Sequence, residues 1–305
     1  MDLRQLNALL AVADHGTFSA AAKALHTVQS NVSNHVGRLE RELGVTLVDR
    51  SSGQLTAEGE VVAAGARRIN GELDGVAADV AALRAEVSGS VRLGMIGTTA
   101  RWLAPALMEE MAERYPKVHL IVTDATTTSL LPQLLAGNLD LAVVNLPIDD
   151  PEVTTELLFT EDTILLTPAD HPFAHRAEVD FTELDGMPLL LEPAGTSFRR
   201  VLDARAADAG ITLVAKAEVD GMRLLASLAF QRFGASVVPS SAAPAWLEGD
   251  WRRIRLTGLE GRSVGLARRR RGAPAAPSRA LREVLSGVVA AEAPTQPGIT
   301  PVNAA

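Results

Sequence analysis

Residues 18–44 of the chain read FSAAAKALHTVQSNVSNHVGRLERELG. Apolar residues recur at helical spacing from Phe18 to Leu25 and again from Val28 to Leu43, and the residues around His26 separate the two runs. The second run carries glutamine, asparagine and serine on its polar side, where Lys and Glu are the usual helix formers. The pattern predicts two short helices joined by a turn, the second of which offers amide and hydroxyl groups to a partner.

Amide and hydroxyl side chains on such a helix suit the major groove of DNA. Asn and Gln pair bidentately with adenine, and Arg pairs with guanine or phosphate, whereas Lys mainly contacts phosphate. A helix-turn-helix places its second helix in that groove. The outward residues of that helix are Gln29, Ser30, Asn31, Ser33, Asn34 and Arg38. The alternative is a polar, solvated face on an ordinary three-helix core.

The flanking segments complete a small helical domain over residues 1–58. Asp2 and Gln5 have the spacing of a capping box, and a leucine-rich helical face follows until Gly16. Thr27 is the expected N-cap of the third helix. The stretch VTLVDRSSGQLT, residues 45–56, alternates around SSG and predicts a small hairpin.

Composition limits the class of protein. The chain has 305 residues, 47% of them apolar, which is enough for two or more domains. It has no cysteine, so disulfides, zinc knuckles and thiol-based sensing are excluded. The net charge is −8, and residues 1–68 carry seven basic and seven acidic side chains, so DNA binding there needs a few placed cations. Without a long apolar run or a signal peptide, we expect a cytoplasmic protein that does not bind membranes.

A long helix is expected over residues 59–88, starting near Thr56. Its apolar positions follow a heptad spacing: Val62, Ile69, Leu73, Val76, Val80, Leu83 and Val87. A helix of roughly thirty residues at about 1.5 Å per residue is too long to be buried along its length in a domain this small. We expect it to pair with a second copy of the chain. The alternative is packing on its own domain.

After Ser88 the pattern becomes α/β. Strand-like runs such as SVRLGMI, VHLIVTD and DLAVVN alternate with helical stretches, which predicts a mostly parallel sheet. No phosphate loop, dinucleotide fingerprint or nucleophile with its base is visible, so we expect no cofactor and no enzymatic activity. The Pro-rich residues 293–305 are expected to be disordered.

The ordered motifs F-S-x-A-A-x-x-L, V-Q-S-N-V-S-x-x-V-x-x-L-E and L-V-D-R within residues 1–60 resemble the winged helix-turn-helix of LysR-type transcriptional regulators. The phrases LLAGNLDLAVV and FTEDTILLTPADHPFA resemble the effector-binding domain of that family, and the likeness extends to about residue 292. It implies an all-α winged helix-turn-helix, a long dimerisation helix and a two-lobed α/β domain similar to type 2 periplasmic binding proteins.

The resemblance also implies partners. Such regulators bind pseudo-palindromic promoter DNA as dimers or tetramers, respond to a small-molecule effector, often an organic acid, and contact RNA polymerase. It adds Arg50, in the wing, to the DNA-facing residues. Asn34 and His35 stand where Arg and Gln are frequent in the family, which removes a contact to phosphate or guanine. The half-site is therefore expected to differ and the salt dependence to be shallow.

The effector domain is expected to span residues 89–292, with the chain crossing between lobes near 162–167 and 261–265. Lobe I then holds about 90–165 and 265–290, and lobe II about 166–264. Ligands bind in the cleft because strand ends and helix N-termini meet there. The effector-binding candidates are Thr98, Thr99, Thr126, Thr127, Thr128, Asn145, Gly195, Thr196, Ser197, Asp220 and Met222. Ordinary helix capping is the alternative for the hydroxyl residues.

Other motifs are interpreted structurally or left open. His171 and His175 have metal-like spacing, but Pro172 argues against a helix, so no metal site is expected. The arginines at 268–271 are interpreted as a solvated strand end rather than a nucleic-acid patch. Arg232 lies in FQRFG and faces either the cleft or solvent. The rivals are a transporter's solute-binding protein, which needs a signal peptide, and an enzyme on the same scaffold.

Overall fold

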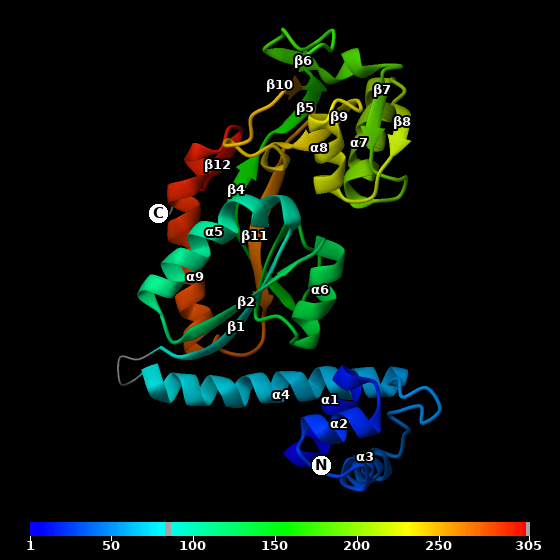
Figure 1. The fold of residues 1–305 in the computed structure, drawn as a ribbon, viewed down its shortest axis with the longest axis vertical. Coiled ribbons are helices and arrows are strands. Elements are labelled where there is room, and N and C mark those ends of the chain that lie inside the picture. Colours follow the sequence, from blue (N-terminus) through cyan, green and yellow to red (C-terminus); the bar gives the residue numbers. More distant parts are fainter. Residues whose placement is uncertain (83–86, 303–305) are drawn as a thin grey trace.

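The computed structural model describes residues 1–82 and 87–302. Figure 1 shows the two lobes of the C-terminal domain at the top, a long helix, α4, along their base, and the N-terminal helices beneath one end of α4. Among the described residues, no helix is both long and apolar enough to cross a bilayer.

The N-terminal domain packs three helices on the start of α4. They are α1 (Leu3–His15), α2 (Phe18–Ala24) and α3 (Gln29–Leu43). The Asp2 side chain accepts a hydrogen bond from the Gln5 backbone amide, and the Gln5 side chain accepts one from the Asp2 backbone amide, so the capping box is present. Apolar side chains at helical spacing, including Leu9, Val36 and Leu39, form its fully buried core.

The start of α3 differs from the expectation. Its N-cap is Val28, and no side chain of the described residues caps it. Thr27, the predicted cap, instead accepts a hydrogen bond at 3.0 Å from the side-chain amide of Asn31. His26, in the turn before α3, takes a left-handed φ of 52°, and the helix starts one residue later than predicted. The wing is a minimal hairpin closed by one antiparallel bridge between Val48 and Leu55.

Helix α4 (Ala57–Ala82) joins the two domains. Midway along the helix, Arg67 pairs with Asp14, and Asn70 donates to Asn7 at 2.7 Å, so α4 is fixed to α1. Its predicted seam is partly exposed: Ile69, Leu73, Val76 and Val80 are 40–63% exposed, while Val62 packs on the N-terminal core. Leu83 lies outside the described residues, and Val87 follows the end of the helix.

Lobe I is a six-stranded sheet in the order β12-β4-β11-β3-β1-β2. Figure 1 shows α5 and α9 on one face and α6 on the other. The elements are β1 (Gly89–Met95), α5 (Gly97–Arg114), β2 (Val118–Asp124), α6 (Thr127–Ala136), β3 (Leu141–Leu146), β4 (Val153–Glu161), β11 (Arg262–Arg269), α9 (Ala276–Glu292), η3 (Ala293–Thr295) and β12 (Ile299–Pro301).

Lobe II repeats the design with the order β6-β10-β5-β9-β7-β8. Helices α7 and α8 pack against two separate apolar clusters of this lobe. The elements are β5 (Thr163–Pro168), β6 (Glu178–Asp180), η1 (Phe181–Leu184), β7 (Pro188–Leu191), α7 (Ser197–Ala209), β8 (Val214–Glu218), α8 (Met222–Phe230), β9 (Ala235–Pro239), η2 (Ser240–Ala242) and β10 (Trp251–Thr257).

The chain crosses between the lobes at Asp162 and at residues 258–261. A side chain at Gly261 would meet the carbonyl oxygen of Glu161 at 2.1 Å, so the two crossings touch. The sheets are mixed rather than mostly parallel, which corrects the expectation. β11 runs antiparallel to β3 and β4, and β5 runs antiparallel to β9 and β10, because strands that cross directly between lobes return beside each other.

The end of the chain also corrects a prediction. Residues 293–302, expected to be disordered, form η3 and then β12, which pairs antiparallel with β4. Ile299 is buried, and the Gln296 side chain accepts a hydrogen bond at 3.1 Å from the Ala245 amide of lobe II. An open sheet edge supplies the backbone partners that the Pro-rich sequence lacks locally. Residues 303–305 lie outside the described part.

Candidate DNA interface and effector cleft

Helix α3 presents a polar face opposite its buried face. Val32, Val36 and Leu39 are buried against α1 and α2. The predicted DNA-facing side chains at positions 29, 30, 31, 34 and 38 are exposed, and Ser33 is half-buried: Gln29, Ser30, Asn31, Ser33, Asn34 and Arg38. No side chain caps α3 within the described residues, so the N-terminus of this helix can meet a phosphate.

Arg50 is held beside this face. Its guanidinium donates to Ser33 at 3.1 Å and pairs with Glu40 at 3.0 Å, and it lies 5.4 Å from the centre of the Phe18 ring. Glu40 also accepts a hydrogen bond at 3.0 Å from the Leu47 amide at the start of the wing. The helix and the wing are therefore tied together, and Arg50 is oriented by both.

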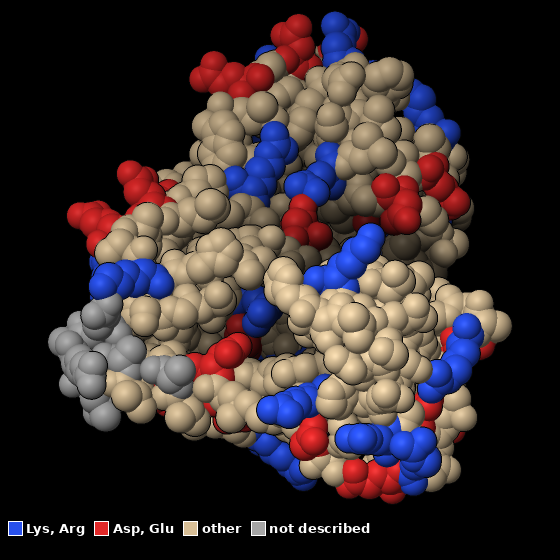
Figure 2. All heavy atoms as spheres, turned by 60° about the horizontal axis from the view of Figure 1, so that its bottom comes forward, with Lys and Arg blue, Asp and Glu red and all other residues tan. Residues whose placement is uncertain are grey.

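Charge on this part of the molecule is interleaved. Figure 2 shows basic and acidic side chains alternating over the lower part of the face it presents, where no broad basic surface gathers. This agrees with the balanced charge of residues 1–68. DNA affinity must come from individual contacts rather than from a uniform positive field.

The two lobes enclose a cleft of about 750 Å³. The helices α5, α6, α7 and α8 all begin at it, since residues of each first turn line its wall. Within the part of the chain that the structure describes, none of these four helices has a side-chain hydrogen bond at its N-cap. By contrast, α1 and α2 are capped by Asp2 and Thr17. Four partial positive charges thus converge on one space.

The predicted effector residues gather in this cleft with one exception. Its lining includes Thr98, Thr126, Thr127, Thr128, Asn145, Gly195, Thr196, Ser197, Asp220 and Met222. Thr99 does not line it: the residue is fully buried, and its hydroxyl has no partner among the described residues. The reason is helical geometry, because Thr98 and Thr99 are consecutive and point in different directions from α5.

Apart from Asp220, the charged residues of the cleft were missed from the sequence. Asp124, Glu192, Arg200, Arg223 and Arg262 also line it. The first four adjoin predicted motifs, at a strand end or in the first turn of a helix, so their positions carried a usable signal. Arg262 has no such neighbour in the sequence and reaches the cleft only through the second crossing.

Arg262 anchors the floor of the cleft. Its guanidinium lies 2.7 Å from the carboxylate of Glu161, which is fully buried, and 2.7 Å from the Thr98 hydroxyl. Glu161 also accepts a hydrogen bond at 2.8 Å from the Ser241 amide of lobe II. Arg262 and Glu161, the hinge pair, thus join both crossings to both lobes.

Two carboxylates line the lobe II side. Burial raises the pKa of Glu192 above its usual range, and the nearby charge of Asp220 raises it further, while a hydrogen bond from Thr196 and the charge of Arg262 lower it. The Thr196 hydroxyl donates to Glu192 at 3.3 Å. Glu192 is thus more readily protonated than an exposed glutamate.

Lobe I offers an acceptor and hydroxyl groups. The Asn145 backbone amide donates to the Thr127 hydroxyl at 3.0 Å, whereas the Asn145 side-chain oxygen is buried and has no partner in the described residues. The Thr126 hydroxyl lies 2.9 Å from that of Thr128. A ligand that carries both an anionic group and hydroxyl donors would satisfy these groups together with the helix N-termini.

The remaining sequence motifs, at Arg232, at residues 268–271 and at His171, lie outside the cleft lining. Arg232 pairs with Asp170 in lobe II, and neither residue lines the cleft. The arginines at 268–271 are not simply solvated: Arg269 donates to the carbonyls of Leu134 and Leu139 at 2.8 and 2.7 Å. His171 accepts a hydrogen bond from the Phe173 amide. No cluster of His, Asp or Glu within residues 1–82 and 87–302 could hold a metal ion.

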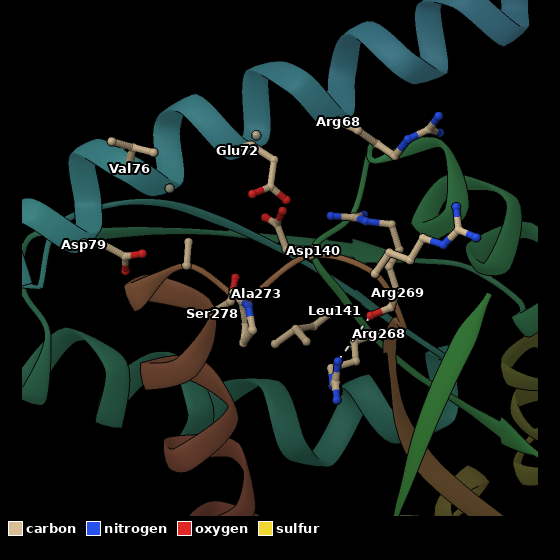
Figure 3. A pocket seen from close by; sticks show the side chains of 16 residues that line it. Arg68, Glu72, Val76, Asp79, Asp140, Leu141, Arg268, Arg269, Ala273 and Ser278 are labelled. Carbon is tan, nitrogen blue, oxygen red and sulfur yellow. Dashed lines mark hydrogen bonds between the residues drawn. The ribbon is translucent and has the colours of Figure 1, made fainter.

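A smaller cavity of about 130 Å³ separates α4 from lobe I. Figure 3 shows Glu72 of α4 and Asp140 of lobe I pointing towards each other across it, with Arg68 and Arg269 nearby. Arg68 donates to the Leu135 carbonyl at 3.3 Å. One face of α4 therefore packs on its own effector domain, as the alternative interpretation of this helix held, while its apolar seam stays exposed.

Comparison with known proteins agrees with this architecture. Residues 3–60 match the "Bacterial regulatory helix-turn-helix protein, lysR family" and residues 84–290 match the "LysR substrate binding domain". The chain is 34% identical to a probable hydrogen peroxide-inducible genes activator of Streptomyces viridosporus, over 93% of this chain and 94% of the relative. It is 37% identical to the HTH-type transcriptional regulator ShiR of Corynebacterium glutamicum, over 69% of this chain and 73% of the relative.

Solved structures show the same fold. A full-length OxyR variant from Pseudomonas aeruginosa is 27% identical, covers 98% of both chains and superposes with a TM-score of 0.77. CbnR, a LysR family regulator solved with its target DNA, is 25% identical, covers 96% of this chain and all of that chain, and has a TM-score of 0.68. With a helix-turn-helix, a two-lobed effector domain and relatives that are regulators rather than enzymes, the chain belongs to the LysR family of DNA-binding transcriptional regulators.

Proposed function

We propose that this regulator reads operator DNA through α3 and the wing and that its cleft binds a small organic acid carrying hydroxyl groups. The observation that carries the effector class is the convergence of four helix N-termini, uncapped within the described residues, on one cleft. Helix N-termini favour negative charge, and backbone N–H groups bind carboxylate oxygens. Thr127 and Thr196 would hold the hydroxyl groups.

The size and charge of the cleft agree with this class. A volume of about 750 Å³ suits a metabolite of modest size. Arg200, Arg223 and Arg262 face Asp124, Glu192 and Asp220 in its lining, so the site is nearly balanced before the helix N-termini are counted. A neutral or cationic ligand would bring no negative charge to these helix N-termini, whereas one carboxylate would.

Names of relatives point to another signal, hydrogen peroxide. This chain has no cysteine, so it can form neither a sulfenic acid nor a disulfide. Reversible binding in the cleft is therefore the mechanism we propose. Effector binding would favour one closure of the lobes and change the placement of the DNA-binding heads, for which a few kcal/mol of differential binding is enough.

We propose that the DNA contacts come from Gln29, Ser30, Asn31, Ser33, Asn34 and Arg38, with Arg50 near a phosphate. Two copies would pair through residues 59–88, since the seam of α4 leaves Leu73 and Val76 about half-exposed or more, at 47% and 63%. Further pairing into tetramers, contact with RNA polymerase at the promoter and a cytoplasmic location would follow for a regulator of this kind.

Isothermal titration calorimetry with a panel of mono-, di- and hydroxycarboxylates tests the effector class. The Thr127→Ala and Thr196→Ala variants should weaken binding of the active compound about five- to tenfold each, the usual effect of one lost hydrogen bond of about 1 kcal/mol. A Ser286→Ala variant, in α9 and outside the cleft lining, is the matched control. Heat from apolar or cationic compounds alone would contradict the proposal.

A further inference from the structure

An ion pair bridges the effector cleft. Arg223, the second residue of α8 in lobe II, pairs with Asp124, the last residue of β2 in lobe I. Both residues line the cleft. Helices α5 and α8 contact each other beside this pair. The pair therefore joins the two lobes across the lining of the cleft.

The carboxylate of Asp124 sits at the N-terminus of α5. A Cβ atom added to Gly97, the first residue of that helix, would lie 2.7 Å from Asp124 Oδ1 and 3.0 Å from Arg223 Nε. The absence of a side chain at position 97 lets both groups approach the helix backbone. Asp124 thus has the surroundings of a bound carboxylate: a guanidinium on one side and uncapped helical N–H groups on the other.

We propose that Asp124 is a tethered carboxylate that occupies the anion position of the cleft, and that the effector's carboxylate displaces it from Arg223. This inference rests on the proposed organic-acid effector. It assigns Arg223 as a specificity-determining residue and Asp124 as an internal competitor that sets the effector's threshold concentration.

The exposure of the pair makes displacement feasible. Arg223 is 55% exposed and Asp124 is 33% exposed, so water screens their attraction. The hinge pair differs, because Glu161 is fully buried and Arg262 is 18% exposed. A ligand can therefore compete for Arg223 while the hinge pair stays closed.

The other features of α8 fit an anion at this place. Its N-cap, Gly221, has a φ of 100° and no side chain, so the first N–H groups of α8 also face the cleft without a cap in the described residues. Arg223 carries its charge from this first turn. The effector's carboxylate would then contact helix N-termini from both lobes and hold them together.

The test compares Asp124→Asn and Arg223→Gln with Asp170→Asn, which breaks a similar exposed Asp–Arg pair in lobe II away from the cleft. Binding of acetate, succinate and citrate is measured by calorimetry on the full-length protein at constant ionic strength, with chloride as the reference anion. Asp124→Asn should bind the active carboxylate about two- to fivefold more tightly, the range that one exposed ion pair is worth. Arg223→Gln should weaken the same binding, and Asp170→Asn should leave it unchanged.

A second readout follows the lobes themselves. Because the chain has no cysteine, spin labels can be placed at Met108→Cys in lobe I and Val201→Cys in lobe II, both 55% exposed. Mixing the labelled protein with an excess of unlabelled protein puts at most one labelled chain in each dimer, so pulsed electron resonance reports the distance between the lobes of that chain. Without any carboxylate, Asp124→Asn and Arg223→Gln should both broaden that distance distribution, and Asp170→Asn should not.

The proposal predicts tighter carboxylate binding in Asp124→Asn and weaker binding in Arg223→Gln, and these opposite changes distinguish it from a structural role. A merely structural ion pair would change affinity in the same direction in both variants. If carboxylates bind the wild type and Asp124→Asn equally, the proposed effector class stands and the tethered-carboxylate inference is overturned. If no carboxylate binds either protein, the proposed effector class is wrong and this inference falls with it.

Discussion

The carboxylate of Asp79 on α4 accepts a hydrogen bond at 3.1 Å from the backbone amide of Ala276, the first residue of α9. The same oxygen accepts a hydrogen bond at 3.0 Å from Arg279 in the first turn of α9. The N-cap of α9, Ala275, has no side chain that could do this. Helix α4 thus supplies the cap of a helix in the effector domain, and the DNA-binding domain, α4 and lobe I are held as one unit.

Loss of this cap should loosen the junction. Asp79→Ala is expected to lower the free energy of unfolding of the effector domain by about 1 kcal/mol, the usual cost of a lost helix cap. Urea titration followed by circular dichroism measures it, and hydrogen exchange should rise in the first turn of α9. Asp74→Ala, an exposed aspartate of the same helix, is the control. An unchanged unfolding midpoint would show that Asp79 contributes nothing.

The exposed seam of α4 should determine the oligomeric state. Leu73 is 47% exposed in the single chain, so a Leu73→Glu variant should still fold but dissociate the dimer, because a charge would be buried between helices. Analytical ultracentrifugation measures the mass. Met108→Glu, at a 55% exposed apolar residue of α5, should leave it unchanged. A dimer that survives the change at Leu73 would place the interface elsewhere.

Two residues of α3 should affect DNA binding differently. If the Gln29 amide reads a base, Gln29→Ala should weaken the free energy of binding to the operator by about 1–3 kcal/mol and change binding to random DNA little. Arg38→Gln should weaken both and reduce the slope of log affinity against log salt by about 0.9, if it meets a phosphate. Mobility shifts across a salt series measure both effects, with Lys23→Gln as the control. Equal losses on both DNAs for Gln29→Ala would contradict base reading.

The hinge ion pair should matter for stability. Glu161→Ala removes the buried partner of Arg262 and should lower the free energy of unfolding by about 3 kcal/mol. Glu156→Ala, on the same strand and in an exposed pair with Arg282, should cost less than about 1 kcal/mol. Chemical denaturation of both variants measures the difference. A similar loss of unfolding free energy in both variants would mean that the buried position of Glu161 adds nothing to the stability.

The raised pKa of Glu192 predicts a pH effect on the effector. As the pH falls from neutrality through that pKa, Glu192 takes up a proton, a negative charge leaves the cleft, and an effector that stays anionic should bind more tightly. Glu192→Gln should remove most of this dependence, whereas Glu248→Gln, which does not line the cleft, should retain it. Calorimetry between about pH 5 and 7.5 measures it, above the ordinary range of carboxylic acids. A persistent pH slope in Glu192→Gln would assign the titration to another group.

The sequence predicted the features that depend on local pattern. Helical spacing, the capping box of Asp2 and the ordered motifs around residues 18–50 were sufficient for the fold class, and strand ends followed by Thr or Gly-Thr-Ser led to residues that meet in one cleft. Such features are encoded within a few turns of chain, where periodicity and capping chemistry act.

Contacts between distant segments could not be predicted in this way. Arg262 contacts Glu161 and Thr98 only because the second crossing returns beside the first. Asp79 and Ala276, which are hydrogen-bonded, are about two hundred residues apart in the sequence. The order of residues 293–302 depends on an open edge of β4. The local pattern also gave one wrong residue. Thr99 directly follows Thr98 on α5, but it is fully buried and does not line the cleft.

The most direct test of the account is a footprint of the purified protein on the DNA upstream of its own gene, with and without the carboxylate that binds most tightly by calorimetry. The account predicts protection of a pseudo-palindrome that shortens or shifts when this compound is added, and no such change with Arg223→Gln at the same concentration. Protection that is identical with and without the compound, although the compound is bound, would contradict an effector-controlled switch.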